Sequence, residues 1–315
     1  MISFFSTAAN AIVPFFFYMM IGYHARLHHI VNDEFFENLN SFVFSIMFRF
    51  MTFYHIYNAG HNYVLSKKLL IFTGISISAV AVLLTLFVPY FVHKNSHRSV
   101  IIQASYRSNV ALLGMPLTIA LFGEQKAAPV AILITLAVIF YNISSVLVFS
   151  RFSATRSGVS FRGLVSQLFH NPLLQGCFVG FLFYSLELYI PDYIINPIAT
   201  IANMTSPLAM IALGGKLRFQ SLNKNIKYLV PVLTLKLLLL PLVVVIIAWV
   251  IGLREIELFL TMLVFATPVA ASSYPMAESM GGDGELAGQF VFISAALSVV
   301  TLFVWIVCFR LFGLI

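Results

Sequence analysis

The chain has 315 residues, of which 60% are hydrophobic and 9% are charged, and its mean hydropathy is +0.96. A soluble globular domain carries about 25% charged residues, so this composition excludes an ordinary water-soluble protein and predicts an all-α integral membrane protein in a lipid bilayer. The net charge of +7 comes largely from cations in short connections between apolar segments. That pattern fits loops beside a membrane and does not predict a nucleic-acid partner.

Ten stretches are candidates for membrane-spanning helices, each of which needs about 20 largely apolar residues. The second, which contains Arg49, and the seventh are the least apolar. The N-terminal stretch lacks a basic segment, so we expect it to be the first helix and not a cleaved signal peptide. In chain order the predicted spans are 4–25, 38–59, 68–92, 99–122, 127–149, 172–190, 193–215, 227–252, 256–280 and 286–313.

Basic residues are distributed unequally between the two sides of this predicted bundle. With the N-terminus outside, the inner connections hold ten Lys and Arg residues and the outer segments hold five. The positive-inside rule then predicts a multi-pass protein of the cell membrane with both termini outside. The longest connection, the predicted cytoplasmic linker 151–170, separates two halves, 1–150 and 171–315, of five helices each.

An odd number of helices per half places the second half upside down relative to the first, which predicts an inverted repeat. A shift of 159 residues aligns Pro116 with Pro275, and a shift of 158 aligns Gly22 with Gly180. Each match is weak alone, but their nearly common register supports the repeat.

The paired prolines predict that helices four and nine are broken. A proline inside a helix removes a backbone hydrogen bond, and in lipid the freed carbonyl needs another partner. A simple kink is the commoner outcome for one proline, but interruptions at matching positions in two halves indicate a transporter binding site. The predicted substrate-binding residues beside the two breaks are Asn109, Gly114, Pro116, Ser272, Ser273 and Pro275.

Over essentially its whole length the chain resembles the auxin efflux carrier family, and more narrowly its bacterial branch of malate or organic-anion permeases. The resemblance is carried by YRSNVALLGMPLTIALFGEQ, TSPLAMIALGGKL and TPVAASSYPMAESMGGDGELAGQFVFISAALSVVTLFVWI. It implies ten helices in two inverted five-helix repeats, with broken helices four and nine crossing near the midplane. It also implies an elevator-type carrier, in which helices 1, 2, 6 and 7 form a scaffold and a possible homodimer contact, and helices 3–5 and 8–10 form the transport unit.

The chain departs from the family pattern in three places. Arg49 stands where family members commonly have a proline in helix two, and Pro275 is displaced from the helix-nine proline of the plant carriers, which falls near Ser273. The long cytoplasmic loop of the plant carriers is also missing. Auxin is therefore a poor substrate candidate.

The charged side chains within the predicted spans include Arg49, Arg107, Lys236 and Glu278, and each costs at least a few kcal/mol unless it faces protein or water. Arg49 could contact an anion or clamp two helices together, and Arg107 could guard the inner mouth or extend toward the cytoplasmic surface. Lys236 and Glu278 could form an ion pair, or Glu278 could couple protons or form a gate. Three cations against one anion favour an anionic substrate, and the half-helix N-termini beyond the breaks add positive charge.

The leading hypothesis is a secondary transporter of a small organic anion, a carboxylate such as malate or a related mono- or dicarboxylate. The alternatives are a membrane receptor that binds the same ligand class without transport, a channel, and an intramembrane enzyme. The enzyme is disfavoured because no catalytic constellation, metal cluster or phosphate-binding loop is recognisable. No cofactor is predicted.

Overall fold

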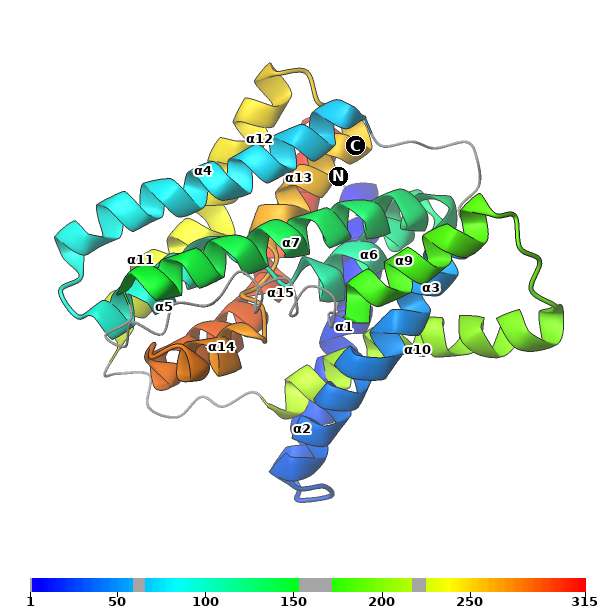
Figure 1. Cartoon of the computed structure of the whole chain (residues 1–315), viewed down its shortest axis with the longest axis horizontal. Helices are drawn as coiled ribbons and strands as arrows, with labels where there is room; N and C mark the ends of the chain where they lie inside the picture. The colour runs from blue at the N-terminus through cyan, green and yellow to red at the C-terminus, as the bar shows by residue number, and fades with distance from the viewer. Residues whose placement is uncertain (1, 59–65, 153–171, 217–224) are drawn as a thin grey trace. The chain divides into compact units, whose positions relative to one another are not determined.

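The computed structural model describes residues 2–58, 66–152, 172–216 and 225–315 (Figure 1). Over these ranges the chain is helical, with π-helical turns η1 and η4 and one 3₁₀ turn, η2. In chain order the elements are α1 (Ile2–Leu27), α2 (Asp33–Phe42), η1 (Val43–Met47), α3 (Phe48–Tyr57), α4 (Lys67–Phe91), α5 (Asn95–Tyr106), α6 (Val110–Phe122), η2 (Glu124–Lys126), α7 (Ala127–Phe152), α9 (Pro172–Ser185), α10 (Asp192–Gly215), α11 (Ile226–Thr234), η4 (Leu235–Leu239), α12 (Leu240–Val250), α13 (Glu255–Ala266), α14 (Ser273–Ser279) and α15 (Gly284–Leu311).

Within the described ranges, five helical segments are long and apolar enough to cross a membrane, in agreement with the predicted all-α membrane class. They are Lys67–Phe91, Glu124–Phe152, Asp192–Gly215, Ile226–Val250 and Gly284–Leu311. The other five predicted spans also contain helix, but two of them are each divided into two half-helices. The count of ten spans therefore stays a prediction.

The first of two compact units comprises Met1–Val64, Ala111–Thr135 and Ser166–Leu217. Its helices pack closely through glycines: a Cβ added at Gly22 of α1 would overlap the carbonyl oxygen of Ile211 on α10. A Cβ at Gly180 of α9 would lie 2.9 Å from the carbonyl oxygen of Phe53 on α3. The two glycines that the repeat aligns thus both lie at close helix–helix contacts.

The second unit comprises Leu65–Val110, Leu136–Val165 and Arg218–Ile315. Its apolar core includes Ile101 of α5, Phe149 of α7, Leu233 of α11 and Phe290 of α15. Element lengths here match at or near the predicted offset: α4 and the segment 226–250 both have 25 residues at a shift of 159, and α5 and α13 both have 12 at a shift of 160. These matching lengths agree with a repeat but do not test its inversion.

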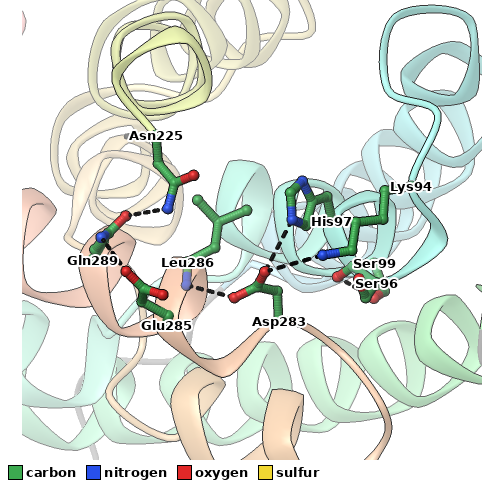
Figure 2. Close-up of polar contacts among 9 residues, drawn as sticks. All are labelled: Lys94, Ser96, His97, Ser99, Asn225, Asp283, Glu285, Leu286 and Gln289. Atoms are coloured by element: carbon green, nitrogen blue, oxygen red, sulfur yellow. Dashed lines mark hydrogen bonds and ion pairs between the residues drawn. The ribbon is translucent and has the colours of Figure 1, made fainter. Parts of the chain in front are cut away.

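A polar cluster joins the first residues of α5 and α15 within the second unit (Figure 2). Asp283 caps α15 by accepting a hydrogen bond from the Leu286 N–H (3.0 Å), and its other carboxylate oxygen lies 2.9 Å from Nε2 of His97. The Asp283 N–H also donates to the carbonyl oxygen of Ser96 (3.1 Å). Lys94 is 3.9 Å from the same carboxylate and mostly exposed, so it adds little. Asp283 therefore holds half-helix α5 against α15.

We expect Asp283→Ala to lower the melting temperature of the detergent-solubilised protein. The change removes a helix cap, which alone costs about 0.5–2 kcal/mol, and it removes the acceptor for His97. Asp283→Asn is the matched control, because its side-chain oxygen can still cap α15 while the negative charge is lost. An Ala variant as stable as the wild type would show that the cluster does not hold α5 in place.

Candidate functional site

Both broken helices are present, but the breaks lie N-terminal to the predicted prolines. Helix α5 ends at Tyr106 and α6 begins at Val110, so the first break is at 107–109. Helix α13 ends at Ala266 and α14 begins at Ser273, so the second break is at 267–272 and contains Pro268. The expectation that Pro116 and Pro275 mark the breaks is therefore wrong in position.

Neither proline breaks its helix, because each lies at a position where a helix tolerates proline. Pro275 is the third residue of α14, in the first turn, where a backbone N–H has no helical partner to lose. Pro116 lies inside α6, which continues through it as membrane helices can. The nearby Gly114 carbonyl accepts a hydrogen bond from the Thr118 hydroxyl (2.7 Å).

The two breaks contact each other through their backbones. The Asn109 N–H donates to the carbonyl oxygen of Pro268 (2.7 Å), and Ser108 and Val269 form an antiparallel bridge. The Val269 N–H donates to the hydroxyl of Ser294 on α15 (2.9 Å). Backbone groups in lipid need such internal partners, so the crossing of the two unwound segments is stabilised by the groups that the unwinding frees.

Arg107 lies at the first break and is 7% exposed. Its guanidinium donates to the side-chain oxygen of Asn142 (2.9 Å), the hydroxyl of Ser272 (2.9 Å) and the thioether of Met276 (3.0 Å). A thioether is a weak acceptor, and a guanidinium has five N–H donors. Among the described side chains no carboxylate pairs with Arg107, and the described partners of its positive charge are all neutral.

Other polar groups at the crossing also have spare hydrogen-bonding capacity. The hydroxyls of Thr267 and Ser273 are buried and have no hydrogen-bond partner among the described residues. The half-buried side-chain amide of Asn109 likewise makes no hydrogen bond to a described residue. Buried polar groups are nearly always satisfied, so this arrangement is suited to a polar molecule bound beside Arg107.

The structure brings together only part of the predicted site. Arg107, Asn109, Ser272 and Ser273 meet at the crossing in the second unit. Three other predicted residues belong to the first unit: Gly114, Pro116 and Arg49. The side chains of Pro275 and Glu278 lie outside the described residues. Nε of Arg49 donates to the side-chain oxygen of Gln175 (2.8 Å), which joins α3 to α9 and fits the helix-clamp alternative.

Sequence reasoning missed Asn142, Met276 and Ser108. Asn142 is a polar residue within an apolar span, a signal that could have been noticed. Met276 and Ser108 carry no comparable signal, because their importance depends on where the chain crosses.

Comparison with known proteins decides the family. The model of the family described as "Membrane transport protein" matches residues 7–160 and 159–306. The chain belongs to this family. The two matched segments meet inside the predicted linker, and the match confirms the resemblance to auxin efflux carriers. A relative from Methanothermobacter thermautotrophicus (strain Delta H), named "Uncharacterized transporter", is 25% identical over 297 residues, which cover 91% of this chain and 93% of the relative.

The protein is thus a multi-pass membrane transporter and not an enzyme. Membership implies a transported substrate and embedding in a bilayer. It does not identify the substrate, so the chemistry at the crossing is the available guide to what is carried.

Proposed function

We propose that the protein is a secondary carrier of a small organic anion, a mono- or dicarboxylate such as malate, and works by alternating access. The observation that carries this proposal is the buried Arg107, whose described partners are all neutral, at the crossing of two unwound helices. Binding sites of secondary transporters are typically formed by such interrupted helices near the bilayer midplane.

The positive charge of Arg107 has no counterion among the described side chains. A buried ion is costly unless it is paired and hydrogen-bonded. A carboxylate matches the guanidinium fork and can accept two parallel N–H bonds from it. The anion would therefore supply the charge partner that the described protein residues do not, while Asn109 and Ser273 could donate to its remaining oxygens.

For the conformational cycle we propose an elevator mechanism, with helices 1, 2, 6 and 7 as a scaffold and possible homodimer contact, and with helices 3–5 and 8–10 as the transport unit. Helices 1 and 7 correspond to α1 and α10, and helices 2 and 6 contain α3 and α9. The close glycine packing of α1 on α10 and of α9 on α3 supports a rigid scaffold. The crossing residues belong to the second compact unit, as a moving binding site requires. Residues Ala111–Thr135, which the proposal assigns to the transport unit, belong to the first compact unit instead.

The experiment that tests the function is counterflow in proteoliposomes with a panel of labelled mono- and dicarboxylates. A carrier accumulates label transiently against an excess of unlabelled substrate inside the vesicles. A receptor would bind a carboxylate saturably without vesicle flux, and a channel would show flux without counterflow. If no carboxylate moves and none shifts the melting temperature, the anion proposal is wrong.

We expect Asn109→Ala to raise the substrate concentration at half-maximal uptake. A hydrogen bond to a charged group is worth about 1.5–3 kcal/mol, which corresponds to roughly a ten- to hundredfold change. Uptake kinetics in proteoliposomes measure it, with the exposed Asn38→Ala as control. An unchanged concentration dependence would remove Asn109 from the binding site.

A further inference from the structure

Lys236 lies in the π-helical turn η4 between α11 and α12, and its side chain is 0% exposed. Its ammonium donates to the carbonyl oxygens of Tyr106 (3.2 Å) and Phe265 (2.9 Å) and to the hydroxyl of Ser108. An ammonium has three N–H donors, so these three acceptors use its full capacity. Lys236 is therefore not free to bind substrate, nor does it need the predicted pairing with Glu278.

The two carbonyls that accept hydrogen bonds from Lys236 lie at the C-terminal ends of two half-helices. Tyr106 is the last residue of α5, and Phe265 is the last but one of α13. The final carbonyls of a helix have no intrahelical partner, and a helix C-terminus carries about half a negative charge. Two such ends together offer about one negative charge, which one monovalent cation balances.

A free cation would bind in the same way. In transporters with interrupted helices, unwound backbone carbonyls and half-helix C-termini coordinate the Na⁺ or H⁺ that drives transport. The crossing places two such C-termini and the Ser108 hydroxyl around a single point, and the Lys236 ammonium occupies that point.

The helix is distorted into a π-helical turn at Lys236. π-helical turns are rare and occur frequently at functional sites. The indole N–H of Trp305 donates to the Leu237 carbonyl within this turn (2.9 Å), which satisfies a backbone group there. Lys236 thus reaches the crossing from a distorted turn that is itself tied to α15.

We propose that Lys236 is a tethered cation that fills a monovalent-cation site at the crossing, so that this carrier needs neither Na⁺ nor K⁺ to form its binding site or to drive transport. The inference deepens the proposed carrier function. It depends on the crossing geometry and not on the identity of the substrate.

The first test uses the unmodified protein. Its melting temperature, and its uptake of whichever carboxylate the counterflow screen identifies, should be the same within error in NaCl, KCl and choline chloride. A tenfold or larger loss of uptake in choline chloride would overturn the proposal.

The second test opens the site. Lys236→Ser removes the ammonium and leaves space beside the two carbonyls, so Li⁺, Na⁺ or K⁺ should raise its melting temperature with a saturable dependence on concentration. The same salts should not stabilise Lys236→Met, whose side chain fills the space without charge, or the exposed Lys227→Ser on the same helix. No stabilisation of the Ser variant by any of the three cations would contradict the proposal.

A transport readout distinguishes this role from a merely structural one. Lys236→Met should lose transport at least tenfold, and Lys236→Ser should regain part of its transport in the salt of the cation that stabilises it. Wild-type transport by Lys236→Met would also overturn the proposal. If both variants fail to fold, the cation independence of the unmodified protein remains decisive. The melting-temperature measurements need no substrate, so a failed substrate screen would not affect them.

Discussion

Replacing Arg107 by glutamine is expected to weaken substrate binding on the order of a hundredfold or more, while the empty protein stays at least as stable as the wild type. Removing one partner of a buried charge pair costs about 2–5 kcal/mol of binding free energy. The empty protein behaves differently, because Arg107 is buried among neutral acceptors. Removing a buried charge that has no counterion among the described residues relieves a desolvation cost.

Two measurements separate this role from a structural one. Binding is followed by substrate-induced shifts in melting temperature, and the melting temperature without substrate is measured on the same samples. Arg107→Lys is the matched control, because it keeps the charge but loses the planar fork, so its affinity should be intermediate. A glutamine variant that binds normally, or that is destabilised without any change in affinity, would show that Arg107 only supports the fold.

The second large effect is expected for Gly22→Ala in the first unit. The added methyl group would overlap the backbone carbonyl of Ile211, which no side-chain rotation can relieve. Overpacking typically costs about 1–3 kcal/mol, and a clash with backbone lies at the upper end of that range. We expect the melting temperature in detergent to fall by several degrees.

A graded series of glycines provides the control. At Gly180 the nearest atom to an added Cβ is 2.9 Å away, and at Gly288 of α15 it is 3.5 Å away. The destabilisation should therefore fall in the order Gly22→Ala, Gly180→Ala, Gly288→Ala. The last change should be neutral or slightly stabilising, because alanine favours helix by about 1 kcal/mol over glycine. Equal effects at all three positions would contradict the close packing of α1 on α10.

The membrane class and most element positions could be predicted from the sequence, because the bilayer demands apolar stretches of a set length. The segment 226–250 begins and ends within two residues of its prediction. Arg107 and Asn109 could also be identified, because polar residues inside apolar spans are costly and therefore conspicuous.

The exact positions of the two helix breaks could not be predicted, because the prediction relied on prolines. Helices accept proline in the first turn and, in membranes, also in the interior. The role of Lys236 was hidden for a different reason. Its acceptors include the backbone carbonyls of Tyr106 and Phe265, and any residue type supplies a carbonyl, so the sequence carries no trace of the partner. The expectation that three intramembrane cations favour an anion changes accordingly. Lys236 donates to the two helix ends and Arg49 donates to Gln175, so Arg107 is the one that we propose for the substrate.

The most direct test of the account is a structure of the transporter in lipid with a transported carboxylate bound. We expect ligand density beside Arg107, with a carboxylate oxygen within hydrogen-bond distance of its guanidinium and of the Asn109 side chain. Lys236 should remain bound to the carbonyls of Tyr106 and Phe265. Density away from the crossing, with Arg107 paired to a carboxylate of the protein itself, would contradict the account.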